Sequence, residues 1–121
     1  ELFKIAKEKG VKYLLNDICE LTSIEEVKNQ LNSFVQQHDY LYLTIDLDGF
    51  SSAYAPGVSA PSPVGFSPSF IFKVLKYLFK TQKVVALDLA ELNPKYDQDA
   101  NTARLAAHLL NAVVEMKKFN Q

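Results

Sequence analysis

The chain has 121 residues, with 13 lysines and arginines against 14 aspartates and glutamates, and 48% of its residues are hydrophobic. This composition predicts one packed domain and excludes a disordered or low-complexity chain. A formal net charge of -1 argues against nucleic-acid and anionic-membrane partners. The single cysteine, Cys19, excludes a disulfide framework and a cysteine-rich zinc site, and it favours a reducing cytoplasm. Because the first residue is Glu1 rather than methionine, we expect the chain to begin partway through a longer protein.

The N-terminal third of the chain predicts a helix, a strand and a second helix. Residues 2–9 carry apolar side chains at helical spacing and end before a glycine. The β-prone residues 11–15 predict a short strand. Thr22 or Ser23 is expected to cap the next helix, whose apolar stripe ends near Gln37.

The rest of the chain predicts two further strands, a long loop and two helices. Residues 40–45 form an almost unbroken apolar run, which is typical of a strand covered on both faces. Residues 49–66 lack periodicity and predict an irregular loop, a kind that often carries function. A helix begins at Ser67-Pro68, residues 84–89 predict a second buried strand, and the last helix follows the polar residues 93–99. This alternation predicts an α/β fold in three layers, a parallel sheet with helices on both faces.

Acidic residues follow both buried strands. Asp46 and Asp48 end the first one, and their spacing is expected to place both side chains on one face of an extended strand. Ligands of open parallel sheets bind at the carboxyl ends of the strands, and two adjacent carboxylates repel each other unless a cation neutralises them. Hard oxygen ligands suit Mg, Ca or Mn. Helix capping and surface exposure remain the alternative for such residues.

The second buried strand leads to two more acidic residues. Glu91 is expected to accept a hydrogen bond from a cationic or amide-like N–H group of a substrate held near the metal. For Asp88, a structural hydrogen bond is at least as good an interpretation as a role at the binding site.

Three blocks of the sequence carry a family resemblance. Residues 42–49 (YLTIDLDG) and 55–61 (APGVSAP) resemble the second metal signature of the manganese ureohydrolases, the family of arginase, agmatinase and formimidoylglutamase. Residues 86–94 resemble the next element of that family, and residues 96–99 and 102–107 are similar to its continuation in formimidoylglutamases. The blocks stand in the family's order and span nearly the whole chain. The resemblance implies an arginase-like fold, present here as the C-terminal portion of a single domain.

The resemblance also implies a chemistry. Asp46 would bridge two manganese ions, Asp48 would bind one of them, and Glu91 would hydrogen-bond the amidine or guanidinium nitrogen of a small substrate. The ions would lower the pKa of a bridging water, and the resulting hydroxide would attack the amidine carbon.

The form of the loop favours one member of the family. Residues 55–61 resemble the formimidoylglutamase version, which implies hydrolysis of N-formimidoyl-L-glutamate to L-glutamate and formamide in histidine degradation. Ser51-Ser52 stands where the family often has Asp-Pro, and Ala60 stands where arginases carry threonine, so arginase itself is disfavoured. Agmatinase or an arginase-like ureohydrolase is the alternative.

Two alternative interpretations belong to other classes of protein. Residues 45–49 also resemble the D-x-D-G opening of haloacid-dehalogenase-type phosphatases, but Phe50 follows where that fold has a hydroxyl residue. A structural half-domain is the other reading, since the family's histidine ligand and its D-x-H-x-D motif are absent from residues 1–121. We therefore expect the chain alone to be inactive, to bind manganese at most partially, and to form a homo-oligomer through exposed sheet edges.

The remaining polar and aromatic residues predict structural roles. The expectations are surface or packing positions for His38 and His108, core or core-edge positions for Tyr40, Tyr42 and Tyr77, an unreactive Cys19, and an ion pair of Arg104 with Asp97 or Asp99. A bidentate contact of Arg104 with a substrate carboxylate is the alternative for that residue.

Overall fold

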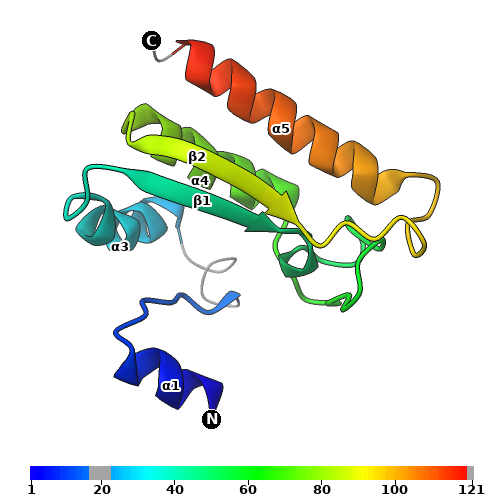
Figure 1. The fold of residues 1–121 in the computed structure, drawn as a ribbon, viewed down its shortest axis with the longest axis horizontal. Coiled ribbons are helices and arrows are strands. Elements are labelled where there is room, and N and C mark those ends of the chain that lie inside the picture. Colours follow the sequence, from blue (N-terminus) through cyan, green and yellow to red (C-terminus); the bar gives the residue numbers. More distant parts are fainter. Residues whose placement is uncertain (17–22, 120–121) are drawn as a thin grey trace.

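The computed structural model describes residues 1–16 and 23–119. Its elements, in chain order, are α1 (Leu2–Glu8), α3 (Ile24–Val35), β1 (Leu41–Asp46), the short 3-10 helix η1 (Leu47–Gly49), α4 (Pro68–Lys80), β2 (Val84–Ala90) and α5 (Asn101–Phe119) (Figure 1). The four predicted helices and the two later strands are confirmed. Two residues named in the predictions, Cys19 and Thr22, lie outside the described residues.

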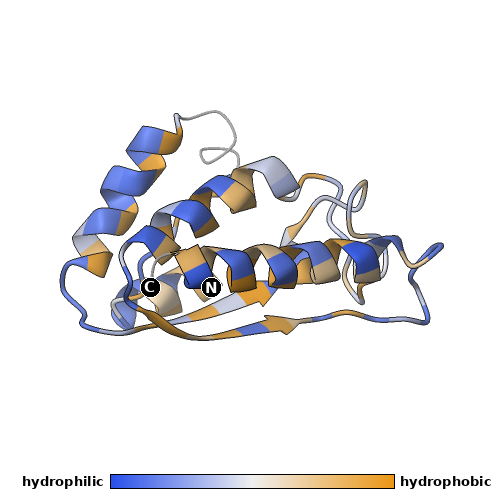
Figure 2. Cartoon of the chain, turned by 90° about the horizontal axis from the view of Figure 1, so that it is seen from above, coloured by the Kyte–Doolittle hydropathy of each residue, from blue (hydrophilic) through white to orange (hydrophobic). Residues whose placement is uncertain are grey.

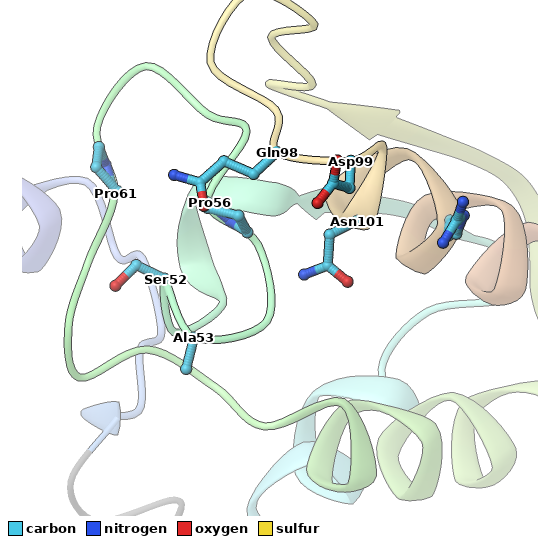
Figure 3. Close-up of a pocket in the computed structure, with 8 residues that line it drawn as sticks. Ser52, Ala53, Pro56, Pro61, Gln98, Asp99 and Asn101 are labelled. Carbon is cyan, nitrogen blue, oxygen red and sulfur yellow. The ribbon is translucent and has the colours of Figure 1, made fainter.

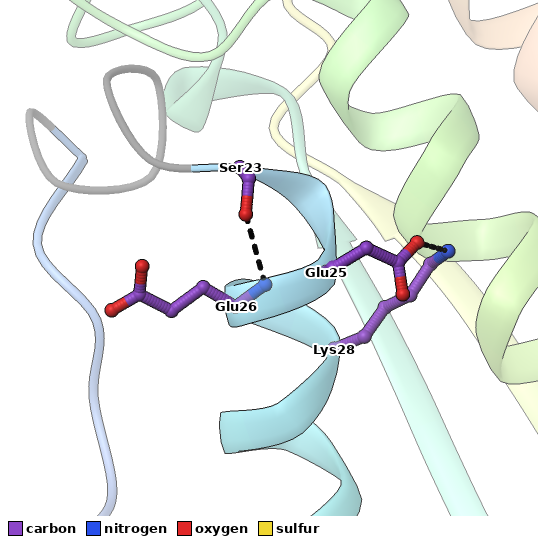
Figure 4. A network of polar contacts seen from close by, with 4 residues as sticks. All are labelled: Ser23, Glu25, Glu26 and Lys28. Carbon is purple, nitrogen blue, oxygen red and sulfur yellow. Dashed lines mark hydrogen bonds and ion pairs between the residues drawn. The ribbon is translucent and has the colours of Figure 1, made fainter.

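Local sequence signals account for where the helices begin. The Ser23 hydroxyl caps α3 by accepting the N–H of Glu26, and Lys28 pairs with Glu25 at 2.6 Å in its first turns (Figure 4). In α4 the Ser67 hydroxyl accepts the N–H of Phe70 at 3.2 Å. A hydroxyl at this position satisfies one of the N–H groups that a helix start leaves unpaired.

The two strands form a parallel pair joined through α4. Tyr42 lies opposite Ala86 and Asp46 opposite Ala90, with an irregularity between Leu41 and Tyr42. Because the strands run in the same direction, their carboxyl ends lie at the same edge of the sheet.

The helices α3, α4 and α5 lie on one side of the strands (Figure 2). The core between them is apolar, and its largest fully buried members are Leu47, Phe50, Val58, Leu75 and Leu109. The predicted parallel α/β class is confirmed. Within the described residues the sheet has helices on this one face only, so the second helical layer of the expected three-layer arrangement is not among them. No described helix combines the length and the apolar character that a membrane span needs.

The opposite face of the sheet is open. Tyr42 is 65% exposed, Thr44 and Ala86 are exposed beside it, and Tyr40, just before β1, is 75% exposed. The prediction that this strand is covered on both faces is therefore wrong for the described chain, as is the core placement of these two tyrosines. Tyr77 packs against the core as predicted. An apolar strand sequence indicates that burial is needed, but it does not supply the covering layer.

The predicted strand at residues 11–15 is also wrong. The backbone there forms no ladder, and Val11, Tyr13 and Leu15 remain largely exposed. A strand needs a neighbour that accepts and donates its backbone hydrogen bonds. Among the described residues, β1 and β2 pair only with each other.

Candidate functional site

Three predicted site residues gather where the strands end. Asp46 is the last residue of β1, Asp48 lies in η1, and Glu91 directly follows β2. Since Asp46 lies opposite Ala90 in the ladder, Glu91 continues the chain at that same edge. The carboxyl edge of the sheet therefore presents three carboxylates, in the position where open parallel sheets bind ligands.

A tight turn separates the two aspartates. The Asp46 carboxylate accepts the N–H of Asp48 at 2.8 Å and thereby caps η1. The prediction that both side chains share one face of an extended strand is wrong, because Asp48 lies in a 3-10 turn beyond the strand. A short acidic side chain offers the backbone a local partner that competes with strand extension.

Asp48 is held in place by its buried neighbours. Leu47 and Phe50 are both 0% exposed, and the Phe50 N–H donates to the Leu47 carbonyl at 3.2 Å. Between these anchors, Oδ1 of Asp48 is buried and has no hydrogen-bond partner among the described residues. A buried carboxylate oxygen without a donor is costly. A cation or a donor from outside these residues would relieve that cost.

The pair of aspartates is an incomplete metal site. Both residues supply the hard oxygen ligands that divalent cations of the Mg, Ca and Mn type prefer. In the part of the chain that the structure describes, no third His, Cys, Asp or Glu joins them in a group able to hold a metal ion. The fit to such an ion is therefore good in ligand type and partial in ligand number.

Glu91 has an unusual backbone. Its φ is 69°, in the left-handed region that residues other than glycine rarely adopt. The side chain is exposed and forms no hydrogen bond or ion pair with the described residues. Strained backbone of this kind is concentrated at functional sites, where the surrounding structure imposes it.

Asp88 makes a structural hydrogen bond, as predicted. Its carboxylate accepts a hydrogen bond from the Tyr42 hydroxyl on the open face of the sheet. This hydrogen bond links β2 to β1, so the Asp88 carboxylate has a structural role.

The loop of residues 49–66 closes on itself next to Asp48. The Phe66 N–H donates to the Gly49 carbonyl at 2.7 Å, and the Ser51 N–H donates to the Phe66 carbonyl at 3.1 Å. Apart from Gly49, which ends η1, and isolated bridges, this loop has no strand or helix, as predicted. Its two ends therefore meet directly where the chain leaves η1.

Gly57 joins this loop to the start of α5. Its N–H donates to the buried Thr102 hydroxyl at 2.7 Å, and its carbonyl accepts the N–H of Asn93 at 2.8 Å. A Cβ at Gly57 would lie 2.5 Å from the Cβ of Asp97, so only glycine fits without displacement. The sequence pattern around Gly57 does not predict this junction, because the partner Thr102 lies 45 residues further along the chain.

Asp97 caps α5. Its carboxylate accepts the N–H groups of Thr102 at 2.8 Å and Ala103 at 3.0 Å. Burial acts to raise the pKa of Asp97, but these backbone donors and the Thr102 hydroxyl together hold the pKa below its ordinary value of 3.8. Asp97 therefore stabilises the fold in its ionised form.

We expect Asp97→Asn to lower the urea midpoint of unfolding at pH 7, because an amide cannot accept both backbone donors. A carboxylate with a lowered pKa stabilises the fold above the unfolded-state pKa, and this contribution disappears as the pH falls through the folded-state pKa. The difference between variant and wild type should thus persist above about pH 5 and shrink below pH 3.8. Urea titrations over this range, with the exposed Asp39→Asn as control, test it. A difference that is independent of pH would contradict the assignment.

The predicted ion pair of Arg104 is wrong. In the described chain the ion pairs are Glu25–Lys28 and Glu115–Lys118, and Arg104 joins neither Asp97 nor Asp99. The reason is that Asp97 is already used by the backbone of α5. The two histidines are exposed, as predicted; the ring of His38 packs on Phe34, with centroids 4.6 Å apart.

Comparison with known proteins agrees with this architecture. The sequence model of the Arginase family matches residues 1–115. A formimidoylglutamase of Legionella pneumophila (strain Paris) is 44% identical over 115 residues, which make up 94% of this chain and 36% of that protein. The chain thus spans about a third of the length of such a relative.

Solved structures show the same fold. The arginase of Bacillus caldovelox superposes with a TM-score of 0.82 at 25% identity, covering 91% of this chain and 37% of that one. The proclavaminate amidino hydrolase of Streptomyces clavuligerus gives a TM-score of 0.86 at 23% identity, covering 98% of this chain and 38% of that one. Because the family model covers residues 1–115, it decides between the ureohydrolase and phosphatase resemblances: the chain belongs to the arginase family.

Proposed function

We propose that residues 1–121 are the C-terminal portion of one arginase-like domain, in a manganese-dependent hydrolase whose full-length form is a formimidoylglutamase. The reaction proposed is the hydrolysis of N-formimidoyl-L-glutamate to L-glutamate and formamide. The proposal draws on the family membership and on the 44% identity to a formimidoylglutamase. A cytoplasmic location, a small amidine as substrate and a homo-oligomeric state are parts of the same proposal.

One observation carries the metal assignment: Oδ1 of Asp48 is buried without a partner next to Asp46 at the carboxyl edge of the sheet. We assign Asp46 and Asp48 as residues that would hold manganese in a complete site of two ions. Bound manganese would supply a Lewis acid that lowers the pKa of a water molecule. The remaining ligands, a histidine and a D-x-H-x-D motif in this family, would come from outside this chain.

Glu91 is proposed to bind the substrate. Its carboxylate accepts hydrogen bonds only, so it suits the N–H groups of an amidinium. The side chain is exposed at the same edge as the aspartates and forms no hydrogen bond or ion pair with the described residues. The left-handed backbone of Glu91 carries an energetic cost. Such strain is concentrated at functional sites, which supports a role other than packing.

Two features favour formimidoylglutamate over arginine or agmatine. The relative at 44% identity bears the formimidoylglutamase name, whereas the arginase structure is 25% identical. Ser51-Ser52 and Ala60 depart from arginases at the loop that follows the aspartates. Agmatinase and arginase activities are the alternatives that an assay must separate.

Metal binding by the isolated chain tests the ligand assignment. We expect calorimetry to detect at most one weakly bound Mn²⁺ per chain, with no amidine hydrolysis. Asp48→Asn should weaken that binding about tenfold or more, since even changes in residues behind a ligand cost about 10- to 100-fold. Asp39→Asn, which removes an exposed carboxylate away from the site, is the matched control. Tight binding of two Mn²⁺ per chain would refute the proposal of a partial site.

The full-length protein tests the activity. Assayed with Mn²⁺ against formimidoyl-glutamate, arginine and agmatine, it should prefer formimidoyl-glutamate. Glu91→Gln should impair the reaction while leaving Mn²⁺ binding intact, because Glu91 is assigned to the substrate and not to the metal. A preference for arginine or agmatine would replace the formimidoylglutamase assignment with the corresponding alternative.

A further inference from the structure

A second polar site lies between the closed loop and the start of α5. It is an open pocket of about 660 Å³, and its polar lining comes from Ser52, Gln98, Asp99, Asn101 and Arg104 (Figure 3). Its size is within the usual range of about 300–1,000 Å³ for small-molecule sites. Neither the two aspartates of the candidate metal site nor Glu91 lines it.

Two opposite charges in this pocket are left free. Arg104 and Asp99 both line it, yet they form no ion pair with each other or with any other described residue. A guanidinium presents a planar fork of donors that matches a carboxylate, and a carboxylate accepts from an ammonium group. The pocket therefore offers one group for each end of a zwitterion. A simple anion such as phosphate would be repelled by Asp99.

The wall that carries both charges is fixed by the fold. Asp99 and Ala100 have φ angles of 51° and 57°, and the Asn101 amide donates to the Tyr54 carbonyl of the facing loop at 3.0 Å. Thr102, the next residue, is fully buried and bonded to the loop through Gly57. The backbone that carries the two charged side chains is therefore already ordered before a ligand arrives.

We propose that this pocket binds a free α-amino acid, with its carboxylate on Arg104 and its ammonium group on Asp99. Ser52, Gln98 and the free oxygen of Asn101 supply further hydrogen-bonding groups around these two charges. The open pocket leaves room for side chains of different length. This site is separate from the proposed metal chemistry and does not depend on it.

Three ligands of equal chain length separate the two charges: L-norvaline carries both, pentanoate only the carboxylate, and pentylamine only the ammonium group. Each is titrated into the ¹⁵N-labelled 121-residue chain at pH 7 with a chelator present. We expect L-norvaline to shift the amides of Ser52, Gln98 and Asn101 saturably, with a dissociation constant in the millimolar range. Pentanoate and pentylamine should bind about fivefold more weakly, the factor that one exposed ion pair supplies.

Two variants test which residue binds each charged group of the ligand. Arg104→Gln should weaken L-norvaline binding about fivefold, the same factor that pentylamine loses by lacking the carboxylate. Asp99→Asn should abolish the preference for L-norvaline over pentanoate, because it removes the charge that binds the ammonium group. Asparagine, like aspartate, tolerates the left-handed backbone at this position. Lys73→Gln removes a positive charge from an exposed position of α4 outside the pocket, and it should leave binding unchanged.

Three results would overturn the proposal: no saturable shift up to about 50 mM L-norvaline, equal binding of L-norvaline and pentanoate by the wild type, or unchanged binding by Arg104→Gln. Because the titration is free of metal, its failure leaves the manganese assignment standing. A failed manganese assignment would in turn leave the amino-acid pocket standing.

Discussion

Replacing Leu109 with alanine should lower the free energy of unfolding by about 3 kcal/mol. Leu109 is 0% exposed and belongs to the cluster that joins α5 to α4 and the sheet. Truncation removes the transfer free energy of three carbon atoms and leaves a cavity that the close-packed helices can fill only partly. Urea denaturation of the isolated chain measures the change.

The adjacent residue provides the control. Leu110 is 43% exposed on the same helix, so Leu110→Ala makes the same chemical change with the same helix propensity. It should cost less than about 1 kcal/mol. If both variants lose the same stability, α5 does not pack on the core as described.

Gly65→Ala should be at least as damaging, with an expected loss of about 3 kcal/mol or more. A Cβ at this position would overlap the carbonyl group of Phe50 and the backbone nitrogen of Ser51. These are backbone atoms at the base of the closed loop, so no side chain can rotate away to make room. The loop, or the buried Phe50 that anchors Asp48, would have to move.

Gly10→Ala is the matched control for Gly65→Ala. A Cβ at Gly10 meets no heavy atom within 4 Å, and only its left-handed φ of 70° opposes the substitution. That strain costs about 1 kcal/mol. Thermal or urea unfolding of the two variants separates backbone strain from overlap. A Gly65→Ala variant as stable as Gly10→Ala would show that the loop base is loosely packed.

Much of the local structure could be predicted from the sequence because its causes lie close together in the chain. Ser23 and Ser67 bond residues three positions later, so their caps follow from a short pattern. The placement of Asp46 and Glu91 at one edge follows from a parallel pair of strands, once the alternation of helices and strands is recognised.

The failures share another cause, which is competition for a partner. Asp48 was expected in an extended strand, but the Asp46 carboxylate captures its N–H and turns the chain. Arg104 was expected to pair with Asp97, but the backbone of α5 already occupies that carboxylate. Spacing along the chain shows which groups are near each other, and it does not show which of several available partners is chosen.

The sequence by itself determined the α/β class, the helix starts, the irregular loop and the identity of the acidic residues that follow the strands. Those features depend on periodicity, capping and residue chemistry, which are local. Only the tertiary structure decided which face of the sheet is covered, that Oδ1 of Asp48 is buried without a partner, and that Arg104 and Asp99 line one pocket unpaired. Each of these depends on groups from distant parts of the chain that folding brings together or leaves apart, and no local pattern encodes that outcome.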